Sequence, residues 1–355
     1  MTRPASFDFL KQLLDTPGPS GFEGATSRVW RDGVSSFSQV STDVTGNCLA
    51  AVGPTGGPTI MLAGHIDEIG LIVTYIDDAG LVYVSTIGGW DVQVLVGQRI
   101  RFSGRSGDVF GVVGKKPIHI MKPDEREKAS KITELWVDIG AATKAETMTV
   151  LGIGDAGVID ARLLELPNRR IVSRSIDDRI GAFVVAEALR LYAERPGDAR
   201  VVAVATTQEE IGLHGGGAVV AASKLNPVMA VAVDVTFASD HPGVEKKEHG
   251  DHTLGGGPVL ARGSVISPVV FRLLRESAES LAIPCSIQAV GRDTATDADF
   301  IHLAREGVAT GLVSIPNRYM HSPNEMVSLD DVERAALLIA EACRRVSHTT
   351  DFTER

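Results

Sequence analysis

One stretch, Val201–Gly212, constrains the fold of this chain more than any other. Its first residues, Val201–Ala205, are all apolar, and such an unbroken run predicts a central parallel strand that is covered on both faces. Two acids, Glu209 and Glu210, stand at its end. Functional groups of open α/β sheets gather at the carboxyl ends of strands, so this end is a candidate site. A solvated pair of charges that caps the strand fits the same pattern.

Apolar strands alternate with amphipathic helices in the first 70 residues and again after residue 165. This alternation predicts an α/β fold with a mostly parallel sheet. The expected strands are 47–52, 59–63, 228–234 and 309–315, and the expected long helices are 180–192, 268–281 and 329–346.

The spacing of apolar runs and turn residues changes between residues 71 and 165. Short strand-like runs, such as 71–76, 81–86 and 99–102, are separated by glycines and other turn residues. This spacing predicts a small all-β domain, barrel-like in form, that is inserted into the other. Residues 1–70 and 166–355 are therefore expected to form one domain around the insertion.

Charge and cysteine usage restrict the partners and the compartment. The chain has 35 Lys and Arg against 45 Asp and Glu, a net charge of −10, which argues against nucleic-acid and anionic-membrane partners. Its three cysteines have neither disulfide nor zinc-ribbon spacing, which favours a reducing cytoplasm. No run approaches the ~20 apolar residues of a membrane span, and the first residues lack the apolar core of a signal peptide. We expect a cytoplasmic protein.

Potential metal ligands stand at further strand ends and at one helix start. His65 follows the strand 59–63, and Asp67 comes two positions later. This pair suits a metal ligand whose second ring nitrogen is held by a carboxylate. The other candidates are Asp177 before the helix 180–192, Asp234 at the end of the strand 228–234, and His321 after the strand 309–315. An aspartate just before a helix is also a common N-cap.

Together with Glu210, these candidate ligands supply two imidazoles and three carboxylates. Two divalent ions need such a number of ligands when one carboxylate bridges them. Such ions lie ~3.5–4 Å apart and lower the pKa of a shared water to about 7. Adjacent residues in a strand point to opposite sides, so Glu209 is free to act as the general base. We expect amide hydrolysis by a bridging hydroxide, with no covalent enzyme intermediate.

Several of these stretches together resemble one family. They are His65–Glu68, Ser175–Arg179, Glu209–Glu210, Ala232–Thr236 and Arg318–Pro323, and the likeness extends to Trp136–Ala141. The chain resembles the cytosolic dinuclear metallo-aminopeptidases that assemble into tetrahedral particles, metallopeptidase family forty-two, which includes glutamyl and deblocking aminopeptidases. Some members were once described as cellulases or endoglucanases. The resemblance covers essentially the whole chain.

The resemblance implies a ligand set and a substrate class. It implies one metal on His65, Asp177 and Asp234, the other on Asp177, Glu210 and His321, and Glu209 as the base. It also implies zinc or cobalt, short peptides bound by their free amino terminus, and a phosphorylase/hydrolase-like catalytic fold. The β insertion would help to build a homo-oligomer, a tetrahedral dodecamer.

Other functions remain open. A carboxypeptidase or deacylase would use the same metal chemistry. A glycoside hydrolase is less favoured, because it needs two carboxylates facing each other ~5–9.5 Å apart and would leave both histidines unused. An inactive scaffold is the alternative outside the enzymes, and the full ligand set with Glu209 argues against it.

Some residue assignments also remain open. We choose Asp177 over Asp178 as the bridging ligand, and we assign Asp240 and His241 to a loop near the mouth of the site. The loop Gly291–Ala298 replaces a shorter glycine-threonine-aspartate-alanine turn of the relatives and is left out of the site. The preferred N-terminal residue, and the choice of zinc or cobalt, do not follow from the sequence.

Overall fold

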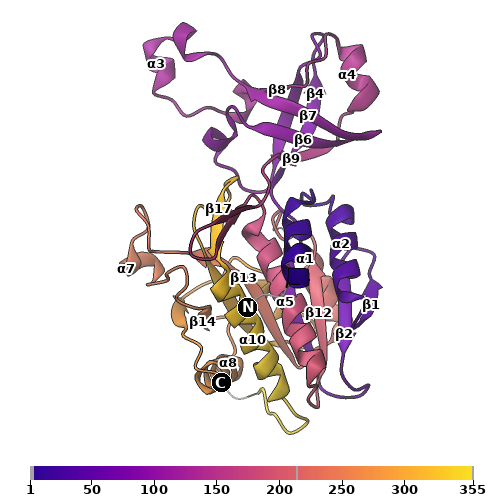
Figure 1. The fold of residues 1–355 in the computed structure, drawn as a ribbon, viewed down its shortest axis with the longest axis vertical. Helices are drawn as coiled ribbons and strands as arrows, with labels where there is room; N and C mark the ends of the chain where they lie inside the picture. The colour runs from indigo at the N-terminus through magenta and orange to yellow at the C-terminus, as the bar shows by residue number, and fades with distance from the viewer. Residues whose placement is uncertain (1–3, 213–214, 354–355) are drawn as a thin grey trace.

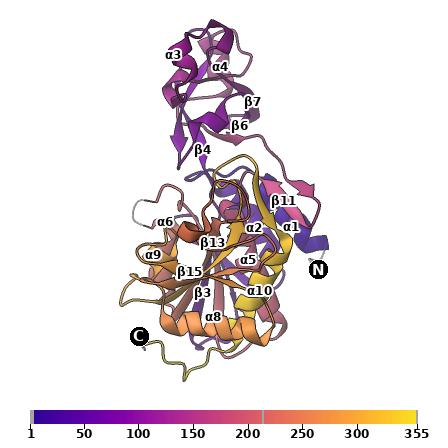
Figure 2. The same ribbon diagram turned by 90° about the vertical axis from the view of Figure 1, so that its left-hand side faces the viewer.

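The structure, a computed structural model, describes residues 4–212 and 215–353. It has two parts, an α/β part built on a large sheet and a small β-barrel. Figures 1 and 2 both show the barrel beyond one end of the sheet, joined to it by a narrow neck of chain. Within the described residues, no helix is long and apolar enough to cross a membrane.

The large sheet has eight strands, and its four central strands are parallel. The outer pairings β1–β2, β2–β12 and β16–β14 are antiparallel, and β14–β15 is parallel. In spatial order the strands are β1 (Gln39–Thr42), β2 (Cys48–Val52), β12 (Arg200–Thr206), β3 (Thr59–His65), β13 (Met229–Phe237), β16 (Ala309–Asn317), β14 (Val259–Gly263) and β15 (Ser286–Val290).

Helices cover both faces of this sheet, which explains the apolar run at Val201–Ala205. Val201 and Ala203 pack into the core beneath one set of helices, while Val202 and Val204 pack beneath the other. Successive residues of a strand point to opposite faces, so both sets must be apolar. The first face carries α1 (Pro4–Asp15), α2 (Gly24–Val34), α5 (Ile176–Glu194), α8 (Pro268–Ser280) and α10 (Leu329–Arg344); the second carries α6 (Gly216–Leu225) and α9 (Ala298–Ile301).

The barrel is closed and has an apolar core of its own. Leu71, Val82, Ile100 and Phe102 are among the side chains that fill it. Its strands, in order around the barrel, are β4 (Gly70–Ile76), β5 (Val82–Ile87), β8 (Trp136–Asp138), β7 (Gly107–Gly114), β6 (Arg99–Gly104) and β9 (Ala156–Ile159). Its short helical segments are η1 (Val92–Leu95), η2 (Ile118–Ile120), α3 (Pro123–Arg126), η3 (Ile132–Glu134) and α4 (Lys144–Val150).

A small three-stranded antiparallel sheet lies between the barrel and α5. It contains β10 (Leu164–Leu166), β11 (Arg170–Ser173) and β17 (Glu325–Ser328), with β11 in the middle. The pairing of β11 with β17 sets Ser173 opposite Glu325 and so brings together two segments that are far apart in the chain. The remaining short helix, α7 (Lys246–His249), lies in the loop after β13.

The α/β fold with a mostly parallel sheet and a barrel-like insertion is confirmed. The strand at Val201 differs from the expectation at its end. It stops at Thr206, because the chain turns at Gln208, whose φ is 62°. Glu209 and Glu210 therefore lie in a loop, and the alternation of an extended strand does not apply to them.

Candidate metal centre

The five predicted ligands meet at the carboxyl end of the parallel strands. His65 is the last residue of β3, and Asp234 is the sixth of the nine residues of β13. Glu210 and His321 stand in the loops after β12 and β16, and Asp177 stands at the start of α5. The four strands are parallel neighbours, so their ends share one edge of the sheet.

Asp177 lies between the two histidines. Its Oδ1 is 3.2 Å from Nε2 of His65, and its Oδ2 is 3.3 Å from Nε2 of His321. Glu210 approaches the same histidine nitrogen from another side, with Oε2 at 3.4 Å from Nε2 of His321. One oxygen of Asp177 thus faces each imidazole, which is the position that a bridging carboxylate needs.

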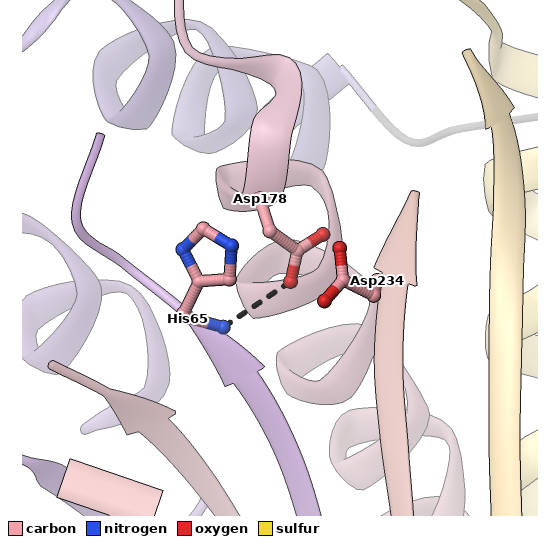
Figure 3. Close-up of side chains that lie close together, drawn as sticks. All are labelled: His65, Asp178 and Asp234. Carbon is pink, nitrogen blue, oxygen red and sulfur yellow. Dashed lines mark hydrogen bonds between the residues drawn. The ribbon is translucent and has the colours of Figure 1, made fainter. Parts of the chain in front are cut away.

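Two groups of three side chains have potential ligand atoms that all lie within 4.8 Å of one another. One is His65, Asp178 and Asp234, and the other is His65, Asp177 and Glu210. Figure 3 shows the carboxylates of Asp178 and Asp234 facing each other beside His65. Asp178 is also held by the backbone, because its oxygens accept hydrogen bonds from the N–H groups of His65, at 3.2 Å, and Gly181, at 3.0 Å.

The charges of the site are those of a crowded acid cluster. Burial and the neighbouring carboxylates hold the pKa of Asp178 and of Asp234 well above the usual range. Burial, with Asp234, Asp297 and Asp177 nearby, raises the pKa of Glu209 to about 10 in spite of the opposing effect of His65. Such shifts arise where carboxylates are buried close to one another.

The histidines show the complementary effect. Burial alone would lower the pKa of His321, but its contacts with Asp177 and Glu210 raise it to about 11. Oε1 of Glu210 is buried and has no hydrogen-bond partner among the described residues. Buried polar atoms are nearly always paired, so this unpaired oxygen is where a cation fits. The residues present therefore suit divalent metal ions.

Asp67 does more than the sequence predicted. Its Oδ1 is 3.6 Å from Nδ1 of His65, the expected partner. Its two oxygens also accept hydrogen bonds from the backbone N–H groups of Glu209, at 3.2 Å, and Glu210, at 3.1 Å. Complete burial would raise the pKa of Asp67, but the nearby His65 ring and the hydrogen bond from the N–H of Glu210 lower it. Asp67 thus joins the end of β3 to the loop after β12.

Glu209 belongs to neither group of potential ligands. Its Oε2 lies 3.7 Å from Nε2 of His65, and its side chain is partly exposed. The turn before it is held by Glu23, a residue that sequence reasoning missed. The carboxylate of Glu23 accepts hydrogen bonds from the N–H groups of Gly21, at 2.7 Å, and Gln208, at 3.2 Å.

Three further contributions to the site carry no sequence signal of their own. The carboxylate of Glu325 accepts hydrogen bonds from the backbone N–H groups of Asp177 and His321. The carbonyl oxygen of Gly89, from the barrel, lies 2.8 Å from Nδ1 of His321. Asp297, in the loop that we left out of the site, is buried and accepts a hydrogen bond of 2.6 Å from Thr206.

Asp240 and His241 lie outside both groups of potential ligands. Asp240 forms an ion pair of 2.7 Å with Arg318 and also accepts a hydrogen bond from the N–H of Leu254. The ring of His241 packs against Tyr319, with the ring centres 5.3 Å apart. Both residues thus tie the loop after β13 to its surroundings.

Comparisons with known proteins show the family to which this chain belongs. A family model described as M42 glutamyl aminopeptidase matches residues 46–338. The lysyl aminopeptidase of Pyrococcus furiosus is 35% identical over 355 residues, which cover 98% of this chain and 99% of that protein.

Two solved structures are similar over nearly their whole length. A TET aminopeptidase from a marine sediment archaeon of the Thaumarchaeota has a TM-score of 0.91 and 32% identity, covering 97% of each chain. The TET1 peptidase of Pyrococcus horikoshii, which can assemble into a tetrahedron or a large octahedral shell, has a TM-score of 0.84 and 28% identity, covering 96% of this chain and all of that one. The chain therefore belongs to the M42 glutamyl aminopeptidase family, whose members are hydrolases that act on peptides.

Proposed function

We propose that this chain is a dinuclear metallo-aminopeptidase that removes N-terminal residues from short peptides. The observation that carries the proposal is the position of Asp177, with one oxygen 3.2 Å from His65 and the other 3.3 Å from His321. Family membership supplies the peptide substrate, and the relatives named lysyl and glutamyl aminopeptidase supply the amino-terminal end.

The proposed ligands divide into two sets that share Asp177. His65 and Asp234 complete the first set, and Glu210 and His321 complete the second. Asp178 stands close enough to join the first set, but both of its oxygens already accept backbone hydrogen bonds. Imidazole and carboxylate ligands suit zinc and cobalt.

Bound divalent ions supply two effects here, because they polarise the scissile carbonyl and lower the pKa of the attacking water. The protein side chains supply the proton transfer. Glu209 takes a proton from the water and passes it to the leaving amine, and no covalent enzyme intermediate forms. The raised pKa of Glu209 fits this task once cations offset the neighbouring carboxylates, since nearby positive charge lowers the pKa of an acid.

We further propose that the chain works as a tetrahedral dodecamer in the cytoplasm. The similarity to the TET1 peptidase of Pyrococcus horikoshii supports the assembly. So does the outer surface of the barrel, where Phe110, Val112 and Ile120 are 52%, 50% and 67% exposed. Phe110 and Val112 are two residues apart on β7 and so share one face of the strand, and exposed apolar side chains that lie close together mark interaction surfaces. The three free cysteines suit a reducing compartment.

The test is a panel of short peptides, each with a free and an N-acetylated amino terminus. Rates are measured before treatment with a chelator, after it, and after zinc or cobalt is restored. We expect cleavage of free amino termini alone, lost on chelation and regained with metal. Equal cleavage of acetylated peptides would favour the carboxypeptidase or deacylase chemistry, and chelator-resistant cleavage would refute the metal mechanism.

A further inference from the structure

Two buried carboxylates outside the proposed ligand sets accept hydrogen bonds from the backbone of residues in the metal centre. Asp67 accepts hydrogen bonds from the backbone of Glu209 and Glu210, as described above. Glu325 makes the same kind of bridge on the other side of the centre. Its Oε2 lies 2.9 Å from the backbone nitrogen of Asp177, and its Oε1 lies 2.8 Å from that of His321. Each oxygen thus serves a different proposed ligand.

The three-stranded sheet explains how the side chain of Glu325 reaches the backbone of both Asp177 and His321. Glu325 is the first residue of β17, which pairs with β11 so that Ser173 lies opposite it. The chain continues from Ser173 to Asp177 within four residues, which places the start of α5 beside Glu325. The loop that carries His321 is closed by two backbone hydrogen bonds of 3.0 Å between Arg318 and Met326.

Both N–H groups need such a partner. Asp177 has φ −76° and ψ 109°, which is not helical, so it lies outside the regular hydrogen bonding of α5. His321 has a φ of 58°, in the left-handed region that residues with a side chain seldom adopt. Glu325 is buried, and without its carboxylate these two backbone donors would lose their hydrogen bonds.

We propose that Glu325 is a positioning residue of the metal centre and acts mainly on the second ion. It holds two of the three proposed ligands of that ion, Asp177 and His321. It holds just one ligand of the first ion, the shared Asp177. The inference rests on the proposed dinuclear site. Loss of a partner that orients a metal ligand lowers metal affinity by about 10–100-fold. Loss of Glu325 therefore weakens the second ion more than the first.

The test compares Glu325→Gln with Asp331→Asn. The glutamine keeps the size of the side chain but replaces one acceptor oxygen with an NH₂ group. Asp331 is an equivalent carboxylate in α10, fully buried and bound to the backbone N–H groups of Gly255 and Gly257, both at 2.7 Å. Each substitution thus changes a buried carboxylate that accepts two backbone hydrogen bonds. The carboxylate of Glu325 holds two proposed metal ligands, whereas that of Asp331 holds the loop 255–257.

Zinc is titrated into the metal-free proteins against a competing chromophoric chelator, which yields an affinity for each ion. We expect wild type and Asp331→Asn to bind two ions alike, and Glu325→Gln to bind the second ion about 10–100-fold more weakly. Excess zinc should restore most of the turnover of Glu325→Gln, which a general loss of structure would not allow. Unchanged second-ion affinity in Glu325→Gln, or an equal loss in both variants, overturns the inference.

Two controls separate the possible failures. If wild type binds fewer than two ions, the dinuclear site itself is wrong and the role of Glu325 falls with it. If Glu325→Gln does not fold, hydrogen exchange in the metal-free wild type decides the matter. Slow exchange of the Asp177 and His321 amides is expected from their hydrogen bonds to the buried Glu325, and fast exchange of either overturns the inference.

Discussion

Glu209 and Glu210 are chemically identical neighbours with different surroundings. The sequence predicted different roles for them from the alternation of a strand, but both lie in a loop beyond Thr206. Their difference comes from the turn at Gln208 and from Asp67, which holds both of their N–H groups. The side chain of Glu210 then reaches His321, at 3.4 Å, while that of Glu209 reaches toward His65, at 3.7 Å.

The first prediction concerns this pair. Glu209→Gln should keep both metal ions and lower kcat by about 10²–10⁴-fold, because an amide cannot carry the proton that general-base catalysis requires. Glu210→Gln is the matched control and should lower the metal content toward one ion per chain. Metal analysis and peptide hydrolysis measure the two effects. A near-normal kcat in Glu209→Gln would exclude its role as the base.

At the level of elements, the barrel contributes to the metal centre through one turn. The Gly88–Gly89 turn follows β5 and reaches His321, whose Nδ1 donates a hydrogen bond of 2.8 Å to the carbonyl oxygen of Gly89. A carbonyl oxygen can only accept, so in the neutral imidazole this contact places the proton on Nδ1 and leaves Nε2 available, as metal binding requires. Gly88 has a φ of +76° and lies against both Ile69 and Glu210.

The second prediction follows from the lack of space at Gly88. A Cβ atom there would lie 2.7 Å from Cγ2 of Ile69 and 3.4 Å from Oε2 of Glu210. Gly88→Ala should therefore displace the turn and lower zinc affinity by about tenfold. Gly97→Ala is the control, because Gly97 has a similar φ of +81° but open space around its Cα. Gly97→Ala and Gly88→Ala both lose about 1–2 kcal/mol of stability, because each places alanine in the left-handed region.

Zinc titration and circular dichroism distinguish the two glycine variants. Both should remain folded, since the barrel keeps its own apolar core. Equal zinc affinities in Gly88→Ala and Gly97→Ala would show that the turn does not influence the metal centre.

For the whole molecule, the exposed apolar side chains of the barrel are the basis of the assembly prediction. Phe110→Glu with Val112→Glu should shift the protein from a large particle to small species, because charges at a packed interface are strongly unfavourable. Val44→Glu is the control, since Val44 is a fully exposed apolar residue of the α/β part. Light scattering after size exclusion measures the mass. An intact large particle in the double variant would remove this surface from the interface.

The sequence by itself determined the general architecture and the chemical types at the site. The apolar run at Val201 requires helices on both faces of a sheet, and residues at successive parallel strand ends must meet at one edge. These two rules depend on local pattern alone. They predicted the α/β fold and a meeting of His65, Glu210, Asp234 and His321, with Asp177 added from a helix start, and the structure brings these residues together. The short strand-like runs between residues 71 and 165 predicted the barrel-like insertion.

Only the tertiary structure decided how these residues are held. Asp177 and Asp178 are equivalent in sequence, and the start of α5 decides which one faces both histidines. Glu325 and Gly89 reach the site through pairings between distant segments, β17 with β11 and the barrel with the loop after β16. Such contacts depend on the path of the backbone through space, which no local periodicity records, and so the groups that orient the ligands became visible only in the folded chain.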